Sequence, residues 1–398
     1  MSLPGPNLLT ARSARRRLRH VELGSAKRRL KIAVLGPVWF PVPPPAYGGT
    51  ERVVSLLTEG LVEAGHDVTL FASGDSTTAA RLVSEFPSAP SDRFGETAVE
   101  LAHALSCYER VDEFDVISDH SGPLAAALAG AVRCPVVHTV HGALDGELGR
   151  AYERIAGLNP RLGMVSISHS QRRPQPNLPW VGTCPNAIDL SEHALSLHRG
   201  DYLAFVGRMS PDKGAHRAIE VAKQLDMPLK LAAKMRTPAE VRYFEDFVRP
   251  QLGADIEYLG ELGPRDKVEL LQNARVTLFP IDWEEPFGLV MIESMACGTP
   301  VVATRRGSVP AVIEDGRSGV IVDDVHEMGA AVAVAERLDA RECRRSVEER
   351  FTPDRMVGAY SGVFERAIHK HGIALPRIPQ MSVSTGLTHR DLTQKTGA

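Results

Sequence analysis

The sequence contains no apolar run long enough to cross a membrane. The longest candidates, such as residues 124–132, reach about half of the roughly 18 apolar residues that a spanning helix needs. The five cysteines are scattered, odd in number and never spaced as C-x-x-C, so neither a disulfide framework nor a zinc ribbon is indicated. We therefore expect a protein of a reducing, cytoplasmic compartment.

Several common site patterns are also missing. No D-x-D, H-E-x-x-H or C-x-x-C motif occurs, so no metal site and no cofactor are expected. There is no Gly-Lys-Ser/Thr run and no strict G-x-G-x-x-G. Their absence argues against a P-loop enzyme and against a dinucleotide-dependent dehydrogenase.

Charge is distributed unevenly along the 398 residues, whose formal net charge is −3. Residues 1–31 hold nine Lys or Arg and one Glu, which leaves −11 for the rest of the chain. A basic segment without apolar periodicity predicts a solvated tail that can make weak contact with an anionic membrane surface. A transit peptide is the alternative interpretation, although the segment lacks the apolar core of a secretory signal. No nucleic-acid partner is expected.

The remaining composition, 43% hydrophobic and 24% charged, is typical of a globular protein and excludes wholesale disorder, collagen and coiled coil. The length predicts two domains. Short apolar runs alternate with amphipathic stretches, which is typical of parallel α/β sheets. The first set of predicted strands covers residues 31–36, 68–72, 116–118, 136–140, 164–167 and 180–183. The second covers 202–207, 229–232, 256–259, 276–279, 301–303 and 320–322, and residues 185–199 form a linker.

These patterns divide the chain into five parts. A basic tail covers residues 1–30, and a first doubly wound domain covers 31–190. A second domain of the same class covers 191–352, and a helix is predicted at 353–370 from its apolar spacing. Residues 371–398 lack periodicity, and we expect a mobile tail there.

The strongest motif begins at Glu285-Pro-Phe-Gly288 and continues through a predicted helix that starts at Leu289 and includes Glu293. It follows a predicted strand, so the helix N-terminus opens at the carboxyl edge of a parallel sheet, where anions bind. Glutamates are poor partners for phosphate but good acceptors for sugar hydroxyls. Taken alone, Glu285 would be a helix-start residue and Glu293 a surface charge. The whole segment favours a site for ribose, diphosphate and sugar.

A second motif, Gly207-Arg208 with Lys213-Gly214, follows the first strand of the second domain. Both cations can face the same crevice and neutralise a diphosphate. In the first domain, two glycines ending at Gly49 precede a predicted helix, so the backbone there can approach a phosphate. His141 ends a predicted strand and can reach the crevice, although a structural role is nearly as well supported.

Together these residues resemble the retaining glycosyltransferases of family 4, which have the GT-B fold of two facing Rossmann-like domains. The resemblance extends over about residues 31–369. It implies that Arg208 and Lys213 hold the donor diphosphate, Glu293 the ribose hydroxyls and Glu285 the hydroxyls of the transferred sugar. It also implies a place near the sugar for His141 and a last helix that returns to the first domain. The donor-binding residues expected on this basis are Gly49, Gly207, Arg208, Lys213, Glu285, Phe287, Gly288, Leu289 and Glu293. In one departure, Ala187 stands in the linker where many relatives carry Gly.

The expected activity is therefore metal-independent transfer of a hexose-type sugar from a UDP- or GDP-sugar to the hydroxyl of an unidentified acceptor, with the anomeric configuration retained. Glu285, Arg208, Lys213 and His141 are the residues expected to act in the reaction. A nucleotide-sugar epimerase or hydrolase on the same fold is one alternative. A nucleotide-sugar binding protein without activity is the other.

Overall fold

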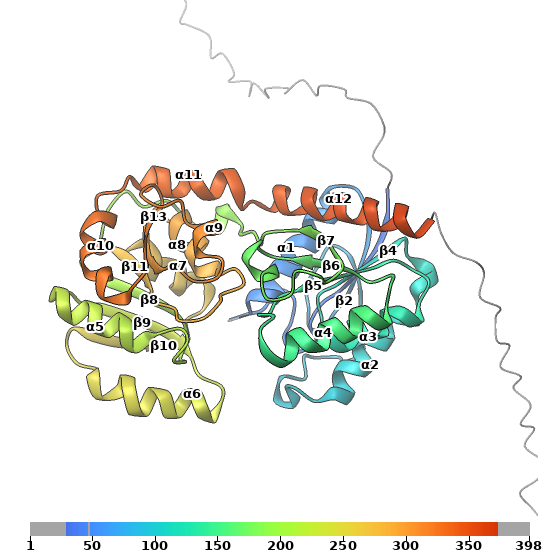
Figure 1. Ribbon diagram of the computed structural model, residues 1–398, viewed down its shortest axis with the longest axis horizontal. Helices are drawn as coiled ribbons and strands as arrows, with labels where there is room; N and C mark the ends of the chain where they lie inside the picture. The colour runs from blue at the N-terminus through green and yellow to red at the C-terminus, as the bar shows by residue number, and fades with distance from the viewer. Residues whose placement is uncertain (1–28, 47, 373–398) are drawn as a thin grey trace, which may run out of the picture.

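The computed structural model describes residues 29–46 and 48–372, which form two α/β domains (Figure 1). Most of the basic tail at 1–30 and of the predicted C-terminal tail at 371–398 lies outside these residues. None of the helices in the described part is long and apolar enough to cross a membrane.

Domain 1 is built on a seven-stranded parallel sheet in the order β3-β2-β1-β4-β5-β6-β7. Its strands are β1 Lys31–Leu35, β2 Asp67–Phe71, β3 Arg81–Val83, β4 Val116–Asp119, β5 Val136–Val140, β6 Gly163–Ser166 and β7 Trp180–Thr183. Its helices are α1 Gly49–Glu63, α2 Thr97–Tyr108, α3 Pro123–Leu128 and α4 Gly146–Leu158. Two buried apolar clusters lie on its two faces. The predicted strands are confirmed, and the sequence analysis missed only β3.

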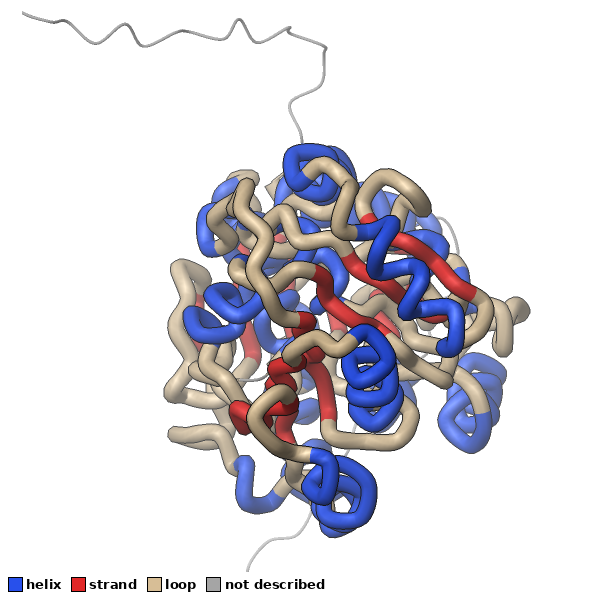
Figure 2. Tube along the Cα trace, turned by 90° about the vertical axis from the view of Figure 1, so that its left-hand side faces the viewer, coloured by secondary structure: helices blue, strands red, loops and turns tan. Residues whose placement is uncertain are grey.

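Domain 2 has a six-stranded parallel sheet in the order β10-β9-β8-β11-β12-β13. Its strands are β8 Leu203–Arg208, β9 Leu229–Lys234, β10 Ile256–Gly260, β11 Val276–Phe279, β12 Val301–Thr304 and β13 Gly319–Val322. Its helices are α5 Ala215–Leu225, α6 Pro238–Tyr243, α7 Pro264–Gln272, α8 Leu289–Ala296, α9 Val309–Val312, α10 Met328–Ala335 and α11 Ala340–Arg350. Figure 2 shows the strands running inside a layer of helices and loops.

In both sheets the strand order reverses beside the first strand, between β1 and β4 and between β8 and β11. Ligands of doubly wound domains bind outside the carboxyl ends of the strands at such a switch point. Helix α1 follows β1 and α8 follows β11, so both begin there. The topology therefore places the motif of Gly49 and the motif of Gly288 at the switch points of their two domains.

The last helix, α12 (Pro353–Gly372), returns to domain 1 as predicted and lies along it in Figure 1. Its apolar face, with Met356, Tyr360, Val363 and Phe364, is buried in a domain 1 cluster. The hydroxyls of Tyr360 and Thr139 lie 3.1 Å apart. The helix extends two residues beyond the predicted end at 370.

Candidate functional site between the domains

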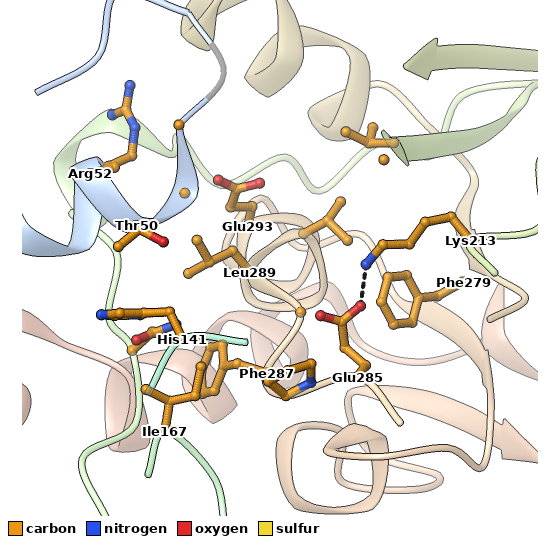
Figure 3. Close-up of a pocket in the computed structure, with 18 of the residues that line it drawn as sticks. Thr50, Arg52, His141, Ile167, Lys213, Phe279, Glu285, Phe287, Leu289 and Glu293 are labelled. Carbon is orange, nitrogen blue, oxygen red and sulfur yellow. Dashed lines mark hydrogen bonds and ion pairs between the residues drawn. The ribbon is translucent and has the colours of Figure 1, made fainter. Parts of the chain in front are cut away.

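A cavity of about 230 Å³ lies where the two switch points face each other (Figure 3). Both domains and the linker contribute to its walls. The predicted site residues that line it are Gly49, His141, Gly207, Lys213, Glu285, Phe287, Gly288, Leu289 and Glu293. The structure thus brings together residues from four separate segments of the chain.

The N-termini of α1 and α8 meet across this cavity. A Cβ atom added to Gly49 would lie 3.1 Å from Cδ1 of Leu289 in the opposite domain, so the start of α1 packs closely on the Leu289 side chain. Gly288 precedes α8 with a φ of 79°, a backbone conformation that favours glycine. Helix N-termini present free N–H groups and a positive dipole end. Two of them aimed into one cavity favour an anionic ligand.

Glu285 is buried, and its carboxylate forms an ion pair with the ammonium of Lys213. Figure 3 shows this pair at the wall of the cavity. Nζ of Lys213 also lies 4.6 Å from the centre of the Trp283 ring. The turn that carries Glu285 is held from outside the cavity, because Ser308 donates from its N–H to the carbonyl of Glu285 (2.9 Å) and from its hydroxyl to that of Phe287 (2.7 Å). The carboxylate therefore stands on a rigid turn.

Glu293 forms the second ion pair of the site. Its Oε1 lies 2.6 Å from Nζ of Lys267, which comes from α7. Burial favours the neutral acid, but the Lys267 ammonium, with smaller contributions from the His193 and Arg52 side chains, outweighs it and lowers the pKa of Glu293. The carboxylate is thus kept ionised and able to accept hydrogen bonds. Sequence analysis missed Lys267, because nothing local distinguishes it from a surface lysine.

His141 ends a buried hydrogen-bonded chain. Its Nε2 lies 3.0 Å from Nδ1 of His120, and Nε2 of His120 lies 2.9 Å from the hydroxyl of Ser118. Burial, with the nearby His138, lowers the pKa of His141 to about 3. His138 points the other way, toward Asp119 (2.6 Å) and Tyr152 (2.7 Å). A neutral imidazole can exchange hydrogen bonds with a hydroxyl but carries no charge.

The loop that carries His141 is held by Gln171. The side-chain amide of Gln171 donates to the carbonyls of Val140 and Gly142, each at 2.8 Å, and its Oε1 accepts from the N–H of Ile167 at 2.9 Å. These bonds flank His141 on both sides in the chain. Sequence analysis missed Gln171, since its partners lie about 30 residues away in the chain.

We expect the His141 ring to stay neutral at every pH above about 5, because its pKa lies near 3. The unfolded chain binds the proton near pH 6.5, so the folded state should lose stability as the pH falls below that value. NMR titration of labelled histidines measures the first effect, and urea unfolding against pH measures the second. A His141 signal that titrates above about pH 5 would contradict this account of the site.

Arg208 is the one predicted site residue whose side chain does not line the cavity. Its guanidinium lies 3.2 Å from Asp212 and 3.9 Å from Glu240, and its side chain is 39% exposed. In this structure the guanidinium is therefore paired with two carboxylates of its own domain. Its role toward a diphosphate stays a prediction.

Asn186, which the sequence suggested only as part of the linker, is buried and lines the cavity. Its Oδ1 has no hydrogen-bond partner within residues 29–46 and 48–372. A buried polar atom without a partner is costly, so Asn186 is suited to accept a bond from a ligand. Its neighbour Ala187, the departure noted in the linker, packs in the domain 1 core. In the same two ranges, no three His, Cys, Asp or Glu side chains group as metal ligands.

Two family models match the chain, one in each domain. The model of Glycosyltransferase Family 4 matches residues 47–180. The model of glycosyl transferases group 1 matches residues 191–351. The gap between them, residues 181–190, covers the end of β7 and the start of the linker.

Individual proteins show the same similarity. A D-inositol 3-phosphate glycosyltransferase from Corynebacterium kroppenstedtii is 33% identical over 42% of this chain, and the match spans only 41% of that relative's own length. Phosphatidyl-myo-inositol mannosyltransferase from Mycolicibacterium smegmatis is 28% identical over 76% of this chain and 84% of its own. The structure of HepE from Anabaena in complex with UDP and glucose superposes with a TM-score of 0.67 at 18% identity, over 85% of this chain and all of that one. With each of its domains matched by a model of these enzymes, the chain belongs to the family 4, group 1 glycosyltransferases and has their GT-B fold.

Proposed function

We propose that this protein transfers a hexose-type sugar from a UDP- or GDP-sugar to an acceptor hydroxyl, with retention of the anomeric configuration and without a metal. The observation that carries the proposal is the pair of Lys–Glu ion pairs on either side of the α8 N-terminus, in a cavity that α1 closes from the other domain. The similar HepE structures contain UDP, glucose and UDP-glucose, which supports a nucleotide-sugar donor.

The donor diphosphate would lie at the facing helix N-termini and take Lys213 as its cation. Lys213 would then leave Glu285, whose carboxylate becomes free to accept hydrogen bonds from the sugar. Glu293, kept ionised by Lys267, would accept those of the ribose. The Lys213–Glu285 ion pair would thus link arrival of the diphosphate to exposure of the sugar-binding carboxylate.

In the transfer step, the bond from the anomeric carbon to the diphosphate oxygen breaks and a bond to the acceptor oxygen forms on the same face. The acceptor proton passes to the departing phosphate oxygen. Charge develops on that oxygen, where Lys213 and the N–H groups at the start of α8 stabilise it most. Neutral His141 would exchange a hydrogen bond with the sugar and help to exclude water.

The experiment is a radiolabelled donor assay with UDP- and GDP-sugars and mixed acceptors, run with and without EDTA. We expect labelled acceptor at an unchanged rate when EDTA is present. Free sugar would instead indicate a hydrolase, an altered sugar on intact nucleotide an epimerase, and no turnover a binding protein. Loss of transfer in EDTA would contradict the metal-free part of the proposal.

A further inference from the structure

The chain crosses between the domains twice, and the two crossings are joined to each other. The linker passes through Ile188 into domain 2, and Phe351 leads from α11 back into α12 on domain 1. The N–H of Ile188 donates to the carbonyl of Phe351 at 3.2 Å. Any rotation of one domain against the other must be absorbed at or beside these residues, as at other hinges.

The side chain of Phe351 packs against the turn that carries Glu285. The rings of Phe351 and Phe287 are both buried and meet edge to face, with centres 5.6 Å apart and planes at 83°. Ile167 from domain 1 and Ile188 from the linker belong to the same apolar cluster. Closely packed clusters change between discrete arrangements and do not deform smoothly. The crossing and the turn therefore share one packed unit.

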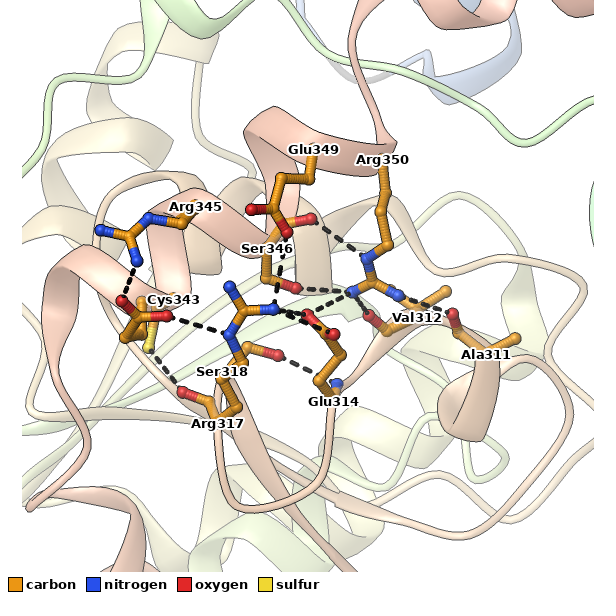
Figure 4. Close-up of polar contacts among 11 residues, drawn as sticks. Ala311, Val312, Glu314, Arg317, Ser318, Cys343, Arg345, Ser346, Glu349 and Arg350 are labelled. Atoms are coloured by element: carbon orange, nitrogen blue, oxygen red, sulfur yellow. Dashed lines mark hydrogen bonds and ion pairs between the residues drawn. The ribbon is translucent and has the colours of Figure 1, made fainter.

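A second connection between the crossing and the Glu285 turn runs through α9. Figure 4 shows its contacts at the end of α9, where Arg350 meets Ala311 and Val312. The guanidinium of Arg350 donates to the carbonyls of Ala311 (3.1 Å) and Val312 (2.6 Å) at the end of this helix, and it stands 4.7 Å from the centre of the Phe351 ring. At the start of α9, Ser308 holds the carbonyls of the Glu285 turn. The residue next to the hinge is thus tied to the turn by hydrogen bonds to backbone carbonyls as well as by packing.

We propose that Phe351 is a positioning residue that couples rotation of the domains to the placement of the turn from Glu285 to Gly288. This inference rests on the proposed function, because the turn is where the transferred sugar would lie. When the domains close on the donor, the Phe351 ring moves with the hinge and carries Phe287 with it. Glu285 then reaches the sugar only in the closed arrangement.

The test compares Phe351→Leu with Phe364→Leu. Phe364 lies on α12, is fully buried in domain 1 and packs on Tyr360 at 5.9 Å, away from the Glu285 turn. Both variants lose the same ring, so a similar fall in Tm is the control for a general packing defect. We expect kcat on the nucleotide sugar to fall about tenfold or more in Phe351→Leu only, because misplacement of a positioned group is costly. The Kd for free UDP or GDP should stay within about twofold, since Glu293 and Lys267 are not on the turn.

Hydrogen exchange of residues 283–289 provides a measurement that needs no turnover. In the wild type and in Phe364→Leu, adding UDP or GDP should slow exchange of this segment. In Phe351→Leu and in the milder Phe351→Met, that gain in protection should be lost. A Phe351→Leu protein that matches Phe364→Leu in both kcat and exchange would overturn the coupling. Absence of transfer by the wild type would overturn the proposed function alone, because the exchange data still decide the coupling.

Discussion

Replacing Lys267 by Met is expected to cost about 3 kcal/mol of unfolding free energy at neutral pH, because the change leaves a buried carboxylate without its partner. Met keeps most of the alkyl stem, so the packing against α8 is largely retained. The side chain of Glu293 is only 4% exposed, against 24% for Lys267, so water replaces the lost ammonium only in part. Urea unfolding measures the loss.

In Lys267→Met, the contribution of Glu293 to the free energy of unfolding should change with pH in the opposite direction. In the wild type the pKa of Glu293 is lowered, so its favourable contribution is complete above the ordinary value of 4.5 and is lost as the pH falls through the folded value. Without Lys267, burial is the dominant influence and raises the pKa of Glu293. The variant then loses stability as the pH rises through that raised value. The gap between the two proteins should therefore widen from about pH 5 to about pH 8.

The double variant Lys267→Met/Glu293→Gln is the matched control. With both charges removed, the stability gap between this variant and the wild type should no longer widen from about pH 5 to about pH 8, and part of the lost stability should return. A gap between Lys267→Met and the wild type that is the same at both pH values would show that the pair contributes through packing and not through charge.

Glu285→Gln and Glu293→Gln should differ in their affinity for free nucleotide, because only Glu293→Gln should weaken it. Loss of a charged acceptor at Glu293 removes roughly 1.5 to 3 kcal/mol of ribose binding, about one to two decades in affinity for UDP or GDP. Loss of the charge at Glu285 instead releases Lys213 from its ion pair. Free nucleotide should then bind Glu285→Gln as tightly as the wild type, or more tightly.

Turnover should separate the same two variants further. Glu285 contacts the transferred sugar in the proposed function, so Glu285→Gln should lower kcat on the nucleotide sugar by about two decades without raising the Kd of the free nucleotide. Calorimetry measures the Kd of the free nucleotide and of the full donor for both variants, and the transfer assay measures kcat. If Glu285→Gln weakens UDP or GDP as much as Glu293→Gln does, the two carboxylates do not divide sugar and ribose between them.

The fold could be predicted from local sequence because its causes are local. Strands such as β11 are buried on both faces of a parallel sheet and therefore appear as continuous apolar runs. Gly288 marks the start of α8 because its φ of 79° favours a residue without Cβ. The strand that was missed, β3, has three residues, none of them fully buried, so it carries no such signal.

By itself, then, the sequence determined the two α/β domains, the existence of the last helix and the glycine-containing motifs at the strand ends, since burial and backbone conformation depend on neighbouring residues. Only the tertiary structure decided which charged groups meet. Lys213 finds Glu285 at a separation of 72 residues, and Lys267 finds Glu293 at 26. Arg208 follows its strand as predicted, yet Asp212 and Glu240 draw its guanidinium away from the cavity. The strength of an ion pair depends on the distance between its two charges. That distance is set by how the sheets and helices pack, so the residues next to a charged group in the sequence do not indicate its partner.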